Sequence, residues 1–164
     1  MGAFAFFGMA MALFLVGVGA QFALLAASAP GVGPTGIAES RAMVAAGAVQ
    51  RFSSDCIAAA TITPGLVATS ISVSMDLQGG GSLQLPAGAS CMTTVAPTGG
   101  RFVYASAQFT PGMVQQLMAD TYQSATWFRV LAPGQAQRIS DGVTVAVPPS
   151  IPAGSVLNWV QLSS

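Results

Sequence analysis

Few side chains in this sequence could carry out chemistry. The chain contains neither histidine nor lysine, so Ser–His, Cys–His and Ser–Lys nucleophile pairs cannot form. Carboxylate pairs that could act as acid and base remain open, but each acidic residue has a simpler role. Glu39 and Asp120 suit a helix surface, Asp141 suits the turn Asp141-Gly142, and Asp55 and Asp76 have polar neighbours. We therefore expect a protein that is not an enzyme and has no small-molecule substrate. The acidic residues are Glu39, Asp55, Asp76, Asp120 and Asp141.

The two cysteines, Cys56 and Cys91, are the remaining reactive groups. In an oxidising compartment they would form one disulfide, which the chain-entropy model values at about 3–4 kcal/mol. The alternative is a pair of small buried hydrophobic residues. A metal site is the weakest interpretation, because there is no histidine and no closely spaced cysteine pair. We therefore predict a disulfide, and neither a metal nor a cofactor.

The low charge of the chain limits its partners. Charged residues make up 6% of the sequence, the formal net charge is zero, and the five arginines are far apart. Nucleic acid and polybasic lipid binding both depend on clustered cations, so we expect neither. A free surface with so few charges is poorly soluble, which favours a protein whose surface is covered by partner proteins.

The elements that must position these residues begin with an apolar run, Met1–Ala27, in which Gln21 is the only strongly polar side chain. Its length suffices for a helix to cross a hydrocarbon layer about 30 Å thick. No basic residue precedes the run, and Pro30 follows the small-x-small triplet 27–29, so we expect a retained span rather than a cleaved signal. Small residues four apart would let another helix approach this span. They are Gly8, Ala12, Gly19 and Ala23.

The rest of the chain predicts a linker and one domain. Residues 28–36 are rich in Pro and Gly and predict a linker, and residues 37–164 predict an α+β domain of two short helices on a mostly antiparallel sheet. The first helix is predicted over 37–60, with Ile37, Val44, Ala48, Phe52 and Cys56 near one face. The second begins with Thr110 as cap and Pro111, and ends near Gln123. Predicted strands are 67–77, 83–85, 101–107, 127–131, 135–139, 143–147 and 156–162, with a loop over 87–100.

Aromatic residues in the predicted strands are candidate interface anchors. Trp127, Phe128 and Trp159 have the size and rigidity of residues that dominate protein interfaces. Strand aromatics are more often part of the core, so both interpretations stay open.

Several segments together resemble the PilM family of conjugative type IVb (thin) pilus systems, the small inner-membrane PilM. They are the short apolar N-terminal segment, the helix after it, the strand Arg101–Tyr104, the helix containing Leu117, and a Gly- and Val-rich finish. That finish comprises Gly134, Gly142-Val143, Val147-Pro148 and the run 151–154.

The resemblance implies a single-pass protein of the bacterial inner membrane, with its C-terminal domain in the periplasm. Its partners would be other pilus-assembly or pilin proteins, with self-association left open, and its role would be in the basal body or in pilin handling. The family supplies no catalytic residue. One alternative is a pilin or minor pilin that polymerises into a fibre, although the basic leader and early Glu of prepilins are missing from 1–27. Another is a lipid-facing or secreted binding domain whose leader is removed, which would require cleavage despite Pro30.

Overall fold

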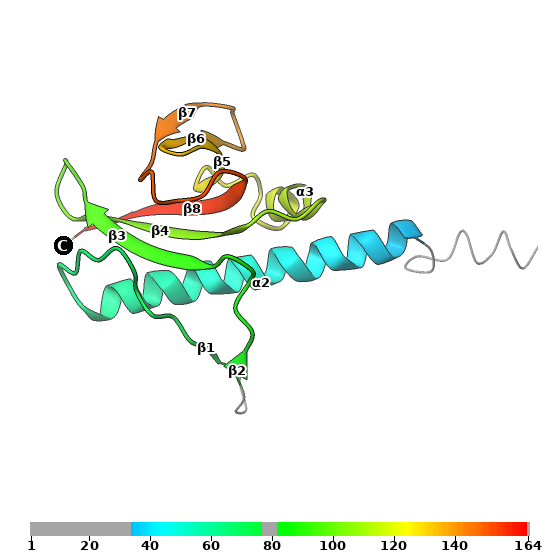
Figure 1. The fold of residues 1–164 in the computed structure, drawn as a ribbon, viewed down its shortest axis with the longest axis horizontal. Helices are drawn as coiled ribbons and strands as arrows, with labels where there is room; N and C mark the ends of the chain where they lie inside the picture. The colour runs from blue at the N-terminus through cyan, green and yellow to red at the C-terminus, as the bar shows by residue number, and fades with distance from the viewer. Residues whose placement is uncertain (1–33, 77–81, 164) are drawn as a thin grey trace, which may run out of the picture. The chain divides into compact units, whose positions relative to one another are not determined.

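The computed structural model describes residues 34–76 and 82–163 (Figure 1). These residues form two helices and eight strands. By contacts the chain divides into the units Met1–Arg41 and Ala42–Ser164, and the packing described below is that of the second unit. The elements are α2 (Pro34–Ile62), β1 (Met75–Asp76), β2 (Ser82–Leu83), β3 (Ser90–Val95), β4 (Arg101–Gln108), α3 (Met113–Asp120), β5 (Trp127–Ala132), β6 (Gln135–Arg138), β7 (Thr144–Ala146) and β8 (Ser155–Leu162).

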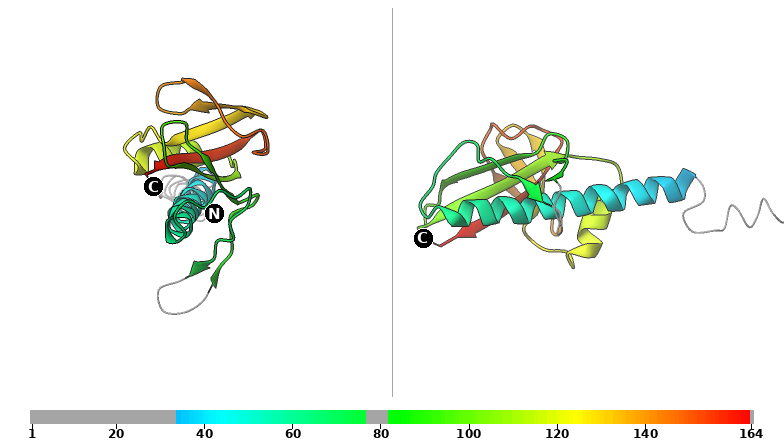
Figure 2. Two further views of the ribbon diagram at one scale, coloured as in Figure 1. Left: turned by 90° about the vertical axis from the view of Figure 1, so that its left-hand side faces the viewer. Right: turned by 90° about the horizontal axis from the view of Figure 1, so that it is seen from below.

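The main sheet has the strand order β3-β4-β8-β5-β6-β7, and its neighbouring strands are all antiparallel. The last strand of the chain, β8, therefore lies in the middle, between β4 and β5. From Ala42 onward, helix α2 runs along one face of the sheet, whereas β5, β6 and β7 curl up on the opposite side (Figures 1 and 2). The predicted α+β class and antiparallel sheet are confirmed.

Helix α2 has 29 residues and begins at Pro34, within the predicted linker 28–36. Proline suits the first turn of a helix, where its missing N–H would have no partner in any case. From Ala42 onward, buried positions recur every three or four residues, so that one face packs on the sheet. They are Ala42, Ala46, Val49, Phe52, Cys56 and Ala60.

The predicted helix is confirmed, but its apolar face was partly misplaced. Val44 is 73% exposed, while Ala46 is fully buried. Small alanine side chains let the helix axis lie close to the sheet. The face that carries the alanines therefore packs inward, although valine is the larger apolar residue. The same closeness appears at Gly112, where an added Cβ would lie 3.0 Å from the Ala42 Cβ.

The segment before β3 differs from the prediction. Residues 67–74 form no strand, and only Met75–Asp76 pairs with Ser82–Leu83. The expected loop over 87–100 instead contains β3, paired with β4 over its whole length. The strand β3 (SCMTTV) has few β-branched apolar residues, and its position at the edge of a long ladder, rather than its own periodicity, determines its conformation.

Helix α3 is shorter than predicted at both ends. Its N-cap is Gly112, which has a left-handed φ of 79°, and no side chain forms a capping hydrogen bond. The predicted Thr110 cap is therefore wrong. The Thr110 carbonyl instead accepts the backbone N–H of Met113 at 3.2 Å. The helix ends at Asp120 because Tyr122 and Gln123 adopt left-handed φ values of 51° and 58°.

The membrane architecture predicted from the sequence is contradicted. Within residues 34–76 and 82–163, no helix combines the length and the apolar character that a membrane crossing requires. The long helix α2 carries four ionisable side chains, Glu39, Arg41, Arg51 and Asp55. The single-span fold and the single-pass inner-membrane localisation are therefore corrected. The segment 1–27, with Gly8, Ala12, Gly19 and Ala23, lies outside the described residues.

Candidate functional site

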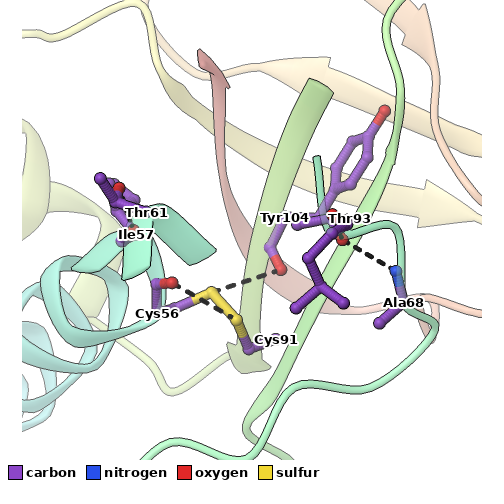
Figure 3. The surroundings of a disulfide bond; sticks show 8 residues. Cys56, Ile57, Thr61, Ala68, Cys91, Thr93 and Tyr104 are labelled. Carbon is purple, nitrogen blue, oxygen red and sulfur yellow. Dashed lines mark hydrogen bonds between the residues drawn. A yellow bond between two sulfur atoms is a disulfide. The ribbon is translucent and has the colours of Figure 1, made fainter. Parts of the chain in front are cut away.

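The predicted disulfide is present and ties α2 to the edge strand β3 (Figure 3). Cys56 and Cys91 have Cα atoms 5.7 Å apart and are 35 residues apart in sequence. Their relative exposures are 0% and 2%. They belong to a buried cluster with Phe52, Val103 and Ala105, so the bond lies in the interface between helix and sheet. Its burial makes it a structural bond rather than an accessible reactive one.

The outer edge of β3 is covered by the chain that precedes it. The Thr93 hydroxyl donates to the Leu66 carbonyl at 2.8 Å and accepts the Ala68 N–H at 2.9 Å (Figure 3). Two backbone bonds, from Thr93 N–H to Ala68 and from Ile71 N–H to Cys91, continue this contact. This edge is therefore closed to strand addition by another chain.

Arg101 has a structural role. It is 6% exposed, and its guanidinium donates to the Ala60 carbonyl in the last turn of α2. A cation at this end of a helix interacts favourably with the carbonyls that have no intrahelical partner and with the helix dipole. Arg101 therefore fixes the end of α2 over the start of β4.

Arg138 is the last residue of β6, and Asp141 lies in the turn between β6 and β7. Their side chains form a salt bridge of 2.8 Å, and the Asp141 carboxylate also accepts the Val143 N–H at 3.1 Å. That backbone hydrogen bond, with a further contribution from Arg138, lowers the pKa of Asp141. Asp141 is therefore committed to the turn.

Asp120, Asp55 and Glu39 each have their own surroundings. Asp120 accepts hydrogen bonds from the amides of Gln50 at 3.2 Å and Gln116 at 2.7 Å. One oxygen of Asp55 is buried with no hydrogen-bond partner among the described residues, and Glu39 is exposed on α2. In the described part of the chain no three His, Cys, Asp or Glu residues come close enough to hold a metal ion.

The three aromatic candidates lie on both faces of the sheet. Trp127 is 3% exposed and packs in the cluster under α2 and α3, while Phe128 is 3% exposed in the cluster on the other face. Trp159 is half-buried, and its ring lies 5.1 Å from that of Phe102 and 5.3 Å from that of Phe128. The structure thus brings Phe128 and Trp159 together and separates Trp127 from them. An interface role for these residues stays a prediction.

A surface pocket of about 310 Å³ lies beside α3 and the β5–β6 hairpin. Two arginines line it: Arg138, which forms a salt bridge with Asp141, and Arg129, whose guanidinium carbon lies 5.2 Å from the centre of the Phe109 ring. In the described part of the chain this guanidinium makes neither an ion pair nor a hydrogen bond. The lining residues are Phe109, Val114, Arg129, Gln137, Arg138, Ile139 and Gly142.

Sequence reasoning did not find this pocket. Phe109 follows β4 and Arg129 lies in β5, with α3 between them in the chain. Only the pairing of β4 and β5 with β8 brings the two residues together. The one available signal was the charge of Arg129 inside the apolar run Trp127–Leu131, which marks an outward position on the strand.

Comparisons with known proteins give one distant likeness. No family model matches the sequence, and no curated protein matches it. The chain is distantly similar to a solved structure named as the protein PilM from Escherichia coli B7A, with 17% sequence identity and a TM-score of 0.45. The match covers 74% of this chain and 92% of that chain. A TM-score this low does not establish a shared fold.

Proposed function

We propose that this protein is a non-enzymatic component of a pilus system that acts by binding other pilus proteins. The pilus context comes from the sequence resemblance, whose segments fall on β4, on α3 and on the turns around β6 and β7. The observation that carries the binding role is the low charge of the sequence. Charged residues are 6% of the chain, where about 25% is usual in soluble domains.

Exposed apolar side chains support the same proposal. Tyr122 is 94% exposed, Ile62 81% and Val95 69%. Single exposed apolar residues are ordinary, but this sequence has few charged side chains to accompany them, which favours a surface that partners cover. The absence of histidine and lysine from the sequence leaves no nucleophile and base of the usual kinds, which supports a role without catalysis.

A fibre subunit is the second candidate function. The observation that favours it is the packing of α2, from Ala42 onward, along an antiparallel sheet to which a disulfide ties it. A helix bearing a small α+β head with a disulfide is the architecture of pilins. The two candidates differ in where the protein is found, because a subunit becomes part of the fibre and an assembly component does not.

Deletion of the gene in the organism of origin tests the proposal. We expect surface pili, counted by electron microscopy, to be lost and to return when the full-length chain is supplied. Immunoblots of sheared surface fibres then separate the two candidates: the protein is absent from fibres if it is an assembly component and abundant there if it is a subunit. Unchanged pilus number and length in the deletion strain would overturn both.

A further inference from the structure

The Arg129 side chain is held in a defined position without being neutralised. Its guanidinium lies over the Phe109 ring at 5.2 Å, a contact in which arginine keeps its charge and its hydrogen-bond donors. Phe109 is itself fixed, because its backbone N–H donates to the Gly154 carbonyl at 3.3 Å and its ring packs against the core below α3. The stacked guanidinium therefore presents its donors at little further entropic cost.

No carboxylate in the described part of the chain balances this charge. Arg129 pairs across the strands with Gln137, so the two share a face of the sheet, and alternation places Arg138 on the other face. Consistent with this, Arg138 lies over the Phe128 ring and is already paired with Asp141.

Asp120, the acidic residue of α3, does not neutralise Arg129 either. Asp120 accepts from Gln50 and Gln116, and neither of these glutamines lines the pocket. One positive charge at the pocket therefore remains for a ligand to neutralise.

The walls of the pocket are apolar. Phe109, Val114 and Ile139 line it and are continuous with the core cluster of α2 and α3. Gln137 adds a polar group whose amide donates to the Gly142 carbonyl at 3.1 Å, which leaves its amide oxygen as an acceptor.

The size and charge of the pocket restrict the ligand. At about 310 Å³ its volume is at the lower end of ligand pockets, which suits one or two side chains rather than a nucleotide or a large cofactor. A single guanidinium matches one carboxylate in a bidentate arrangement, whereas a phosphate usually requires more cations.

We infer that this pocket binds a glutamate or aspartate side chain, next to an apolar residue, of a partner protein. The carboxylate accepts from the Arg129 guanidinium, and the neighbouring apolar side chain packs on Val114 and Ile139. This inference rests on the proposed function for the identity of the ligand as a protein, and it assigns a binding surface to that function.

Binding of short peptides to the full-length chain tests the inference. The probes are acetyl-Leu-Glu-amide, its neutral counterpart acetyl-Leu-Gln-amide, and acetyl-Leu-Leu with a free C-terminal carboxylate. The backbone amide signals of Val114 and Ile139, which line the pocket, report binding in ¹⁵N-resolved NMR spectra of every variant. The arginine side-chain N–H signals in the same spectra include that of Arg129, which is assigned by its loss in Arg129→Gln. We expect the Glu peptide to shift that signal saturably, with at least tenfold weaker binding of the Gln peptide.

Matched variants make the result specific. Arg129→Gln is expected to lose the preference for the Glu peptide, and Phe109→Leu to weaken it severalfold because the stacking is lost. Arg41→Gln, which removes an exposed arginine of α2, is expected to bind as the unaltered chain does. Equal binding of the Glu and Gln peptides, or unchanged binding by Arg129→Gln, would overturn the inference.

The free-acid peptide distinguishes the source of the carboxylate. Tighter binding of acetyl-Leu-Leu than of the Glu peptide would contradict the assignment to a side chain and point to a C-terminus. Because the assay uses the isolated chain, its outcome does not depend on whether pili are lost in the deletion strain. A negative result for peptide binding and a negative result for the pilus proposal can therefore be told apart.

Discussion

Reduction of the Cys56–Cys91 disulfide should remove a large part of the stability of the domain. The cysteines are 35 residues apart, and the chain-entropy model gives about 3.8 kcal/mol at 25 °C for closing a loop of this length. Domains of this size are stable by about 5–15 kcal/mol, so the loss is a substantial fraction of the total. Reduction keeps both sulfur atoms in place, and it therefore isolates the covalent bond from the cavities that alanine substitutions would create.

Urea unfolding followed by tryptophan fluorescence measures this loss. Trp127 is buried and Trp159 half-buried, so both indoles change surroundings when the sheet opens. With a urea dependence of about 1.5–2 kcal/mol per molar, the midpoint of the reduced chain should lie about 2 M below that of the oxidised chain.

The double variant Cys56→Ala/Cys91→Ala is the control for the reductant itself, because its midpoint should be the same with and without reductant. If the oxidised and reduced forms of the unaltered chain unfold within 0.5 M of each other, roughly 1 kcal/mol on the same scale, the loop-closure reasoning is wrong.

Three further predictions concern turns and backbone conformation. Gly100→Ala places a Cβ against a backbone carbonyl of β8 at a φ of +77°, and should lower the unfolding free energy by more than about 2 kcal/mol. Gly99→Ala, at +96° with open space around it, is its control and should cost only the conformational strain. Tyr122→Gly should raise the urea midpoint, because it relieves a left-handed φ of 51° at a side chain that is 94% exposed. The pKa of Asp141 is lowered by the Val143 N–H, so the turn should be fully held above the usual carboxyl pKa and loosen as the pH falls through the lower folded value. Hydrogen exchange at the Val143 amide checks this, and in Asp141→Ala that exchange should lose the corresponding pH dependence.

The strands of the second half could be predicted because local chemistry and tertiary structure agree there. Aromatic and β-branched residues mark β4 and β5, and the turns at Pro133-Gly134 and Asp141-Gly142 fix where neighbouring strands begin. The predicted strand 127–131 and the observed Trp127–Ala132 differ by one residue. Each of these segments would favour an extended conformation without help from the rest of the fold.

The first half could be predicted less well because its conformation depends on distant partners. In the segment 67–74 apolar and polar residues alternate as they do in a strand, yet the segment has no regular secondary structure. It lies along the edge of β3, where Ala68 is hydrogen-bonded to the Thr93 side chain. The strand β3 itself has little periodicity and is extended because β4 offers it a ladder of six paired positions. Such non-local pairing leaves no signal within a short window of sequence.

The strand arginines show why composition alone could not locate a binding site. Arg101 and Arg138 have the same side chain as Arg129, but the fold engages the first at the end of α2 and the second in an ion pair with Asp141. An arginine whose donors are engaged within the fold contributes to stability, and recruiting it to a ligand would break those bonds. Arg129 lies outward on a central strand, where an aromatic ring holds it without neutralising it. Its charge is therefore available to a partner at no cost to the fold, which distinguishes it from arginines that look identical in the sequence.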